Sequence, residues 1–312
     1  MPSLNSGLTE TMTPPRRILA TRGGALGDFI LSFPSLAALR HTWPDAEIRL
    51  LASPAHAALA TAWNLADSSR DPNSSSASAL FSASLPLDRS WQSWIAECDV
   101  VVSWLPDPDL AFQKHCRSLG SRSFHQGPHS LTSHLPAWQQ LAAALPDGLS
   151  ALPFQRPHSP SSNTLAIHPG SGGRSKIWPL ANWQHTILQL AASHRFSSFL
   201  IVTGECELDS PAASLANLLR NSGIDAEPAH NLPLPSLAER LSACTAFAGH
   251  DSGVSHLAAA CGLPCALLFG PTNPAVWAPP NARTLVAPHT NLADLPTDAV
   301  IPFIANTPTT SA

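Results

Sequence analysis

The stretch with the most chemistry is residues 245–274, where polar side chains fall between an apolar strand pattern and an alanine-rich helix pattern. Asp251 and Ser252 come at the expected strand end, and Gly253 follows at the first turn of the expected helix. Free backbone N–H groups at such a helix start bind phosphate, beside the carboxyl ends of parallel strands. His256, one turn further on, faces the same end. A simple helix cap also explains Asp251 and Ser252, but the glycine and the histidine favour an anion-binding site.

A second glycine-rich loop, residues 168–179, follows an expected strand at 164–167. Its glycines let the backbone approach a ligand closely. Ser171 and Gly172 are candidate backbone donors, and Lys176 adds a positive charge beside them. The alternative is an ordinary exposed loop with a solvated lysine.

The N-terminal part predicts a strand–turn–helix–strand unit. The expected strands are 16–21 and 47–52, the turn is 22–28, and the helix runs over 29–41. The turn lacks the G-x-G-x-x-G spacing of dinucleotide-binding proteins, which argues against a nicotinamide cofactor. It ends in Asp28, which either caps the helix or acts as a general base.

One further carboxylate is a candidate ligand for a ribose. Glu207 lies just past an expected strand at 199–202, where a carboxylate can accept hydrogen bonds from ribose hydroxyls. We therefore include Glu207 among the donor-binding candidates.

No metal or cofactor site is expected. His125, His129 and His134 are spaced by four and five residues, and Gly127 and Pro128 prevent a shared helical face. The six cysteines form no C-x-x-C pair and are expected to be small buried residues.

The composition limits the classes of protein. A net charge of −4 over 312 residues argues against a nucleic-acid-binding protein that works by bulk electrostatics. No apolar signal core and no long apolar run are found, so a cytoplasmic protein is expected. A polar, proline-rich stretch at 154–163 indicates a linker between two domains, residues 1–157 and residues 158–312.

Three motifs resemble glycosyltransferase family 9, the ADP-heptose:lipopolysaccharide heptosyltransferases. They are D-S-G-x-x-H-x-A-A-x-x-G-x-P from Asp251, H-P-G-x-G-x-x-x-K-x-W-P from His168, and R-x-x-x-L-G-D from Arg22. The resemblance implies an α/β protein of GT-B architecture, with two Rossmann-like domains facing a central cleft. It also implies that Asp28 is the catalytic base and that Lys176 lies near the donor phosphates. The family's nucleoside-binding glutamate has no match at the expected spacing, because Leu208 stands there.

The expected function follows from this resemblance. The C-terminal domain would bind an ADP-sugar, and the N-terminal domain would bind a lipopolysaccharide-core or related glycan acceptor. A sugar, expected to be a heptose, would be transferred with inversion and without a metal ion, by a cytoplasmic protein peripheral to the inner membrane. Two alternatives stay open: a non-catalytic relative that binds sugar nucleotides, and a nucleotide-sugar epimerase on the same fold.

Overall fold

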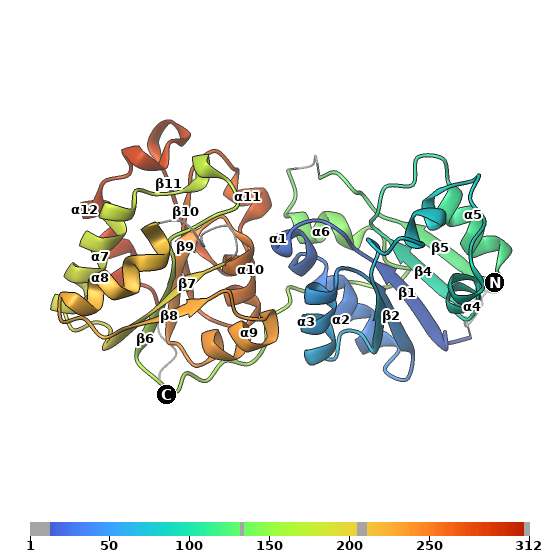
Figure 1. Ribbon diagram of the computed structural model, residues 1–312, viewed down its shortest axis with the longest axis horizontal. Coiled ribbons are helices and arrows are strands. Elements are labelled where there is room, and N and C mark those ends of the chain that lie inside the picture. Colours follow the sequence, from blue (N-terminus) through green and yellow to red (C-terminus); the bar gives the residue numbers. More distant parts are fainter. Residues whose placement is uncertain (1–12, 132–133, 205–210, 309–312) are drawn as a thin grey trace, which may run out of the picture.

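The computed structural model describes residues 13–131, 134–204 and 211–308 of the chain. It contains two parallel β-sheets, each flanked by helices, which form two lobes side by side (Figure 1). The predicted α/β class is confirmed.

The N-terminal lobe is built on a five-stranded sheet with the order β3-β2-β1-β4-β5. The central strand β1 is buried along most of its length and pairs in parallel with both β2 and β4. Such strands are covered by helices on both faces, which explains their nearly continuous apolar sequences. The strands are β1 (Arg17–Thr21), β2 (Glu47–Leu51), β3 (Ser68–Arg70), β4 (Val100–Ser103) and β5 (Ser123–Gln126).

The helix predicted over 29–41 is wrong as a single element, because the structure has two helices there. A short helix, α1 (Leu26–Ile30), precedes α2 (Phe33–Thr42), in which Pro34 occupies the first turn. Proline has no N–H group and its ring clashes with a preceding helical turn, so the second helix must begin next to it. The remaining helices of this lobe are α3 (Pro54–Ala62), α4 (Arg89–Ala96), α5 (Ala111–Ser118) and α6 (Ala137–Ala142).

The C-terminal lobe carries a six-stranded parallel sheet with the order β11-β10-β9-β6-β7-β8. Counted from β6, this is the 3-2-1-4-5-6 order of a dinucleotide-binding Rossmann sheet. Its strands are β6 (Thr164–His168), β7 (Ser198–Thr203), β8 (Ala226–His230), β9 (Ala246–His250), β10 (Cys265–Phe269) and β11 (Arg283–Val286). Its helices are α7 (Leu180–Ala192), α8 (Leu215–Asn221), α9 (Leu234–Ser242), α10 (Gly253–Ala260), α11 (Pro274–Trp277) and α12 (Thr297–Ala305).

Two helices of this lobe are preceded by 3₁₀ turns. Helix α8 follows a 3₁₀ turn at Pro211–Ser214. Helix α12 follows a 3₁₀ turn at Leu292–Asp294. In the second case Pro296 lies between them and forms the cap of α12.

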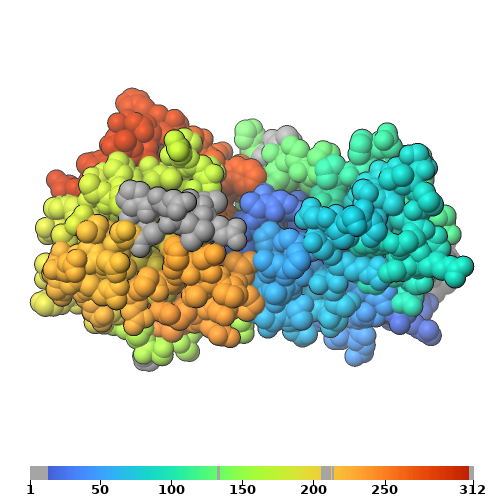
Figure 2. Space-filling model, in the orientation of Figure 1, coloured from blue at the N-terminus to red at the C-terminus, as the bar shows by residue number. Residues whose placement is uncertain are grey.

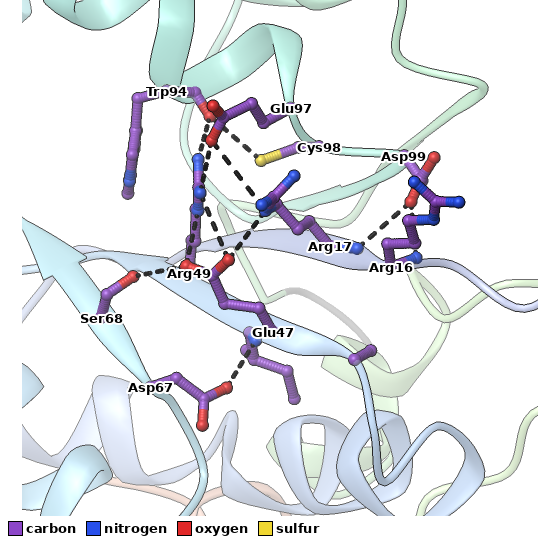
Figure 3. A network of polar contacts seen from close by, with 12 residues as sticks. Arg16, Arg17, Glu47, Arg49, Asp67, Ser68, Trp94, Glu97, Cys98 and Asp99 are labelled. Carbon is purple, nitrogen blue, oxygen red and sulfur yellow. Dashed lines mark hydrogen bonds and ion pairs between the residues drawn. The ribbon is translucent and has the colours of Figure 1, made fainter.

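A charged network lies at the amino ends of the first sheet, where β1 and β2 begin (Figure 3). Arg49 is buried, and its guanidinium group pairs with Glu47 at 2.9 Å and with Glu97 at 2.6 Å. Arg17 pairs with Glu47 at 2.8 Å, and the backbone N–H groups at residues 16 and 17 donate to Asp99. This network is at the opposite edge of the sheet from the carboxyl ends of the strands, so we regard it as structural.

The two lobes are in contact through helices from both sides. Helix α1 packs against α10, and α3 packs against α9. Figure 2 shows the blue surface of the N-terminal lobe directly against the orange surface of the C-terminal lobe. Within the described residues, no helix is both long and apolar enough to cross a membrane.

Candidate active site

Three of the segments singled out in the sequence leave the sheets at their topological switch points. In the first sheet the strand order reverses between β1 and β4, and the turn 22–28 follows β1. In the second sheet it reverses between β6 and β9, which are followed by the loop 168–179 and by α10. Crevices at such points are where open α/β sheets bind ligands.

The N-terminus of α10 has the predicted cap. The Ser252 side chain accepts a hydrogen bond from the backbone N–H of Ser255 at 3.4 Å. It also lies 3.1 Å from Nδ1 of His168, at the end of β6. The first N–H groups of a helix have no partner within the helix, so those at Gly253 and Val254 are available to an anion.

Lys176 is held at the same end by a carboxylate. Its Nζ atom lies 2.7 Å from Oδ2 of Asp251. The same oxygen accepts a hydrogen bond from the Thr272 hydroxyl at 2.8 Å, and Ser171 donates to the Asp251 backbone carbonyl at 3.1 Å. Asp251 is 9% exposed, so the ammonium group compensates a largely buried charge.

His250 fixes the loop that carries Lys176. It is fully buried, and its Nε2 atom accepts hydrogen bonds from the Trp178 backbone N–H at 3.0 Å and from Nε1–H of Trp183 at 3.3 Å. Its Nδ1–H donates to the Gly170 carbonyl at 3.1 Å. Burial lowers the pKa of His250 to about 3, so the ring is neutral, as the two hydrogen bonds accepted by Nε2 require.

Asp28 faces this group from the other lobe. Its Oδ2 atom accepts a hydrogen bond from the backbone N–H of Ala25 at 3.2 Å. The guanidinium group of Arg22 lies behind it, with Nη2 3.6 Å from Oδ1 and Nε donating to the Asp28 backbone carbonyl at 3.0 Å. The Asp28 side chain is 37% exposed, so it is presented to solvent on one side.

A cavity of about 480 Å³ joins these groups, and its walls come from both lobes. The residues that line it include eight of the nine sequence candidates: Asp28, Ser171, Gly172, Lys176, Asp251, Ser252, Gly253 and His256. The ninth, Glu207, lies outside the described residues. The structure therefore brings the candidates from three distant segments to one cavity.

His256 lies where the two lobes meet. It is 5% exposed, and burial lowers its pKa to about 4 against the opposing effects of Asp251 and Asp28. A Cβ atom at Gly27 of α1 would lie 3.1 Å from its ring. The imidazole is therefore neutral near pH 7 and forms part of the inter-lobe wall of the cavity.

A second cavity of about 600 Å³ shares Gly172, Ser252 and Gly253 with the first. It extends between the ends of β7 and β8 and the start of α9, where Thr203 and Leu234 line it. His56 of α3 lines it from the N-terminal lobe, stacked on Phe29 with ring centroids 4.8 Å apart. Burial lowers the pKa of His56.

Three contributors were missed by the sequence analysis. Arg22 was noted only as a motif residue, and neither His250 nor Thr272 was predicted to be a site residue. A polar residue at the end of a buried strand is a weak signal for Arg22 and His250. Nothing in the sequence pairs Thr272 with Asp251, because only the fold brings these residues together.

Among the described residues, no group of three histidine, cysteine, aspartate or glutamate side chains is arranged to hold a metal ion. The five described cysteines are buried, as expected, and burial raises their pKa; for Cys98, Cys244 and Cys261 the value is about 12.

Two Rossmann-like lobes with a shared cavity at their switch points define the GT-B class of architecture. Residues 135–296 match glycosyltransferase family 9 (heptosyltransferase), which is more than half of the chain. The chain therefore belongs to glycosyltransferase family 9, as its motifs indicated.

Known proteins resemble this chain in part of its sequence or in its fold. The chain is 31% identical over 115 residues to lipopolysaccharide heptosyltransferase 1 of Pseudomonas aeruginosa, a match that spans 37% of this chain and 31% of that protein. The fold is similar to that of E. coli heptosyltransferase WaaC with ADP, with a TM-score of 0.72, 18% identity, and coverage of 94% of this chain and 100% of the other. For E. coli ADP-heptose lps heptosyltransferase II the TM-score is 0.70 at 16% identity, with coverage of 92% and 97%.

Proposed function

We propose that this protein is an inverting glycosyltransferase that moves a sugar from an ADP-sugar to a lipopolysaccharide-core or related glycan acceptor. The observation that carries the proposal is the shared cavity. A carboxylate from one lobe, Asp28, faces a helix N-terminus and a lysine from the other lobe across it. In this proposal residues 158–312 bind the donor and residues 1–157 bind the acceptor.

The donor diphosphate is assigned to the start of α10. The backbone N–H groups at Gly253 and Val254 would donate to its oxygens, and Lys176 would supply a positive charge. Negative charge builds on the diphosphate as its bond to the sugar breaks, and donors already in place stabilise it most at that point. These groups occupy the role that a metal ion takes in other nucleotide-sugar enzymes, so we expect activity to survive chelation by EDTA.

Asp28 is assigned as the general base. It would take the proton of the acceptor hydroxyl while the acceptor oxygen attacks the anomeric carbon. The bond from that carbon to the diphosphate oxygen breaks, and its electron pair leaves with the diphosphate. The attack comes from the face opposite the leaving group, so the anomeric configuration is inverted.

The second cavity is assigned to the nucleoside. It adjoins the α10 N-terminus, and most of its described walls are apolar, which suits a stacked base. Adenine and heptose are proposed because the related WaaC structures contain ADP and an ADP-2-deoxy-2-fluoro heptose. The acceptor is proposed from the name of the Pseudomonas relative, a lipopolysaccharide heptosyltransferase.

A nucleotide panel tests the donor assignment. The melting temperature is measured with ADP, UDP, GDP, CMP and NAD. A ligand at about 100 times its Kd adds about 2.7 kcal/mol to the free energy of unfolding. We expect selective stabilisation by ADP. Stabilisation by UDP or GDP instead would contradict the ADP assignment, and binding of ADP without turnover of any ADP-sugar would favour a non-catalytic relative.

A further inference from the structure

Arg22 has an arrangement that the proposed roles of Asp28 and Lys176 do not use. It follows β1 directly, and its side chain is only 6% exposed although it carries a charge. Its backbone N–H donates to the Leu51 carbonyl at 3.1 Å, which fixes the residue at the end of the sheet. A buried guanidinium group is costly unless it is paired, and its ion-pair partner is Asp28.

The contacts around Asp28 form a small cradle. The Nε–H of Arg22 donates to the Asp28 backbone carbonyl at 3.0 Å, which anchors the guanidinium group to α1. The Nη2 atom then lies 3.6 Å from Oδ1, while Ala25 N–H holds Oδ2 at 3.2 Å. Gly24 has a φ of +91°, and a Cβ atom there would lie 2.9 Å from Oδ2. The turn therefore closes around the carboxylate from three sides and leaves one side open to the cavity.

The charges around Asp28 single out Arg22. The titratable groups that interact electrostatically with Asp28 are Arg22 on its own turn, His56 of α3 and His256 of α10. Burial lowers the pKa of both histidines, so both rings are neutral near pH 7. Burial also lowers the pKa of Arg22, and the negative charge of Asp28 opposes this effect. A guanidinium group nevertheless remains charged at any physiological pH.

We infer that Arg22 is a positioning residue for the base of the proposed transfer, because it fixes the direction of the Asp28 carboxylate and supplies a permanent positive charge beside it. The inference rests on the proposed function of Asp28. Its physical basis is that a general base must be aligned with the proton it removes, and that a misplacement of about 1 Å can cost about 10²-fold in rate.

A purely structural ion pair is the competing explanation, and a matched arginine separates the two. Arg40 of α2 is built in the same way: it donates to the Ala46 carbonyl at 2.9 Å and pairs with Asp67 at 2.6 Å. It lines neither the first nor the second cavity. Arg40→Gln therefore removes a comparable structural pair without touching the site.

The test is the kcat and the donor KM of sugar transfer by the full-length chain and the variants Arg22→Gln, Arg22→Lys and Arg40→Gln. For Arg22→Gln we expect kcat to fall about 10-fold to 100-fold with the donor KM nearly unchanged. Arg22→Lys keeps the positive charge but should not restore kcat, because lysine lacks the fork that donates to the backbone and the carboxylate together.

The inference is wrong if Arg22→Gln behaves like Arg40→Gln in both kcat and donor KM. If the unaltered chain transfers no sugar, the proposed function fails first, and crystal structures decide the Arg22 inference separately. In Arg22→Gln the contact between Ala25 N and Asp28 Oδ2 should then be lost. An Asp28 side chain that keeps this contact would overturn the positioning role.

Discussion

Lys176 and Asp251 lie 2.7 Å apart at the start of α10, and they differ in exposure. The carboxylate side chain is 9% exposed and the lysine side chain is 32% exposed. If the donor binds as proposed, the lysine can reach its phosphates while Thr272 still donates to the carboxylate. The pair would then keep a long side chain near the donor before the donor arrives.

Removing the lysine charge should weaken donor binding. A hydrogen bond to a charged group contributes about 1.5–3 kcal/mol, so Lys176→Gln should raise the Kd for ADP about 10-fold to 100-fold. Calorimetric titration with ADP measures this. Lys114→Gln is the control, because Lys114 of α5 donates to the Asp109 carbonyl, away from both cavities. An unchanged Kd for ADP in Lys176→Gln would show that Lys176 does not contact the donor phosphates.

His250 should make the fold sensitive to acid. Its pKa is lowered from 6.5 to about 3 by burial. Between these values the unfolded chain binds a proton that the folded chain does not, so the free energy of unfolding falls as pH is lowered through this window. One such proton contributes a slope of about 1.4 kcal/mol per pH unit.

Urea unfolding at pH 5.5 and pH 4.5 tests this effect. His250→Gln should be less stable at both pH values, because Trp178 and Gly170 lose their partner. Its free energy of unfolding should change less between the two pH values, by the contribution of about one proton. His41→Gln, on the exposed surface of α2, is the control and should keep the original slope. If the free energy of unfolding changed equally with pH in the unaltered chain, His250→Gln and His41→Gln, His250 would not titrate as its burial requires.

At the residue level, the place of a candidate in the fold could be inferred where its chemical type was tied to a local pattern. Asp28 and Ser252 each sit next to a glycine after a strand, and Lys176 lies in the glycine-rich loop after β6, so their place at a sheet edge was predictable. Their roles stay predictions. That they share one cavity depends on how two lobes meet, and no local pattern contains this information. Thr272 and Arg22 act through partners that the fold brings into contact, which explains why neither was identified as a site residue.

Helices α1 and α10 meet through glycines. A Cβ atom at Gly253 would lie 2.8 Å from the Leu26 Cβ and 3.0 Å from the Gly27 backbone nitrogen. Since one of these neighbours is backbone, the helices would have to separate to make room. The absence of a side chain at these glycines therefore permits the short distance between α1, which carries Asp28, and the N-terminus of α10, the proposed phosphate site.

Gly253→Ala should push the two helices apart. Overpacking of this kind costs about 1–3 kcal/mol, and we expect it to appear as a larger radius of gyration in small-angle X-ray scattering. Gly173→Ala is the matched control on the same cavity wall, because an added Cβ there meets only the Lys176 Cγ, at 3.9 Å. A scattering curve for Gly253→Ala that coincides with that of Gly173→Ala would contradict a tight contact between the helices.

The elements with strong apolar patterns were predictable, and the others were not. β1, β6, β7 and β9 are largely buried runs of mostly apolar residues, and strands were predicted there from sequence. β5 and β8 are edge strands with exposed polar residues, SFHQ and AEPAH, and neither was predicted as a strand. Their strand geometry comes from pairing with β4 and β7, so tertiary contacts rather than propensity decide it.

The connection between the lobes is bonded to both of them. Phe154 packs on Phe33 and Trp63 of the N-terminal lobe, with centroids 5.5 and 5.9 Å away. Two residues later, the Arg156 backbone N–H donates to the Ala260 carbonyl of α10 at 2.9 Å. The stretch predicted as a linker is thus attached to both lobes, which restricts any domain motion to the short segment between these contacts.

In the proposed transfer the two lobes together place Asp28 against a sugar nucleotide held by α10. The rate of heptose transfer from ADP-heptose to a lipopolysaccharide core that lacks the sugar tests this placement, measured for the unaltered chain and for Asp28→Asn. We expect kcat to fall about 10²–10⁴-fold in the variant, with the Kd for ADP unchanged because Asp28 does not hold the phosphates. Equal rates in the two proteins would show that Asp28 is not the base, and would contradict the proposed role of the cavity between the lobes.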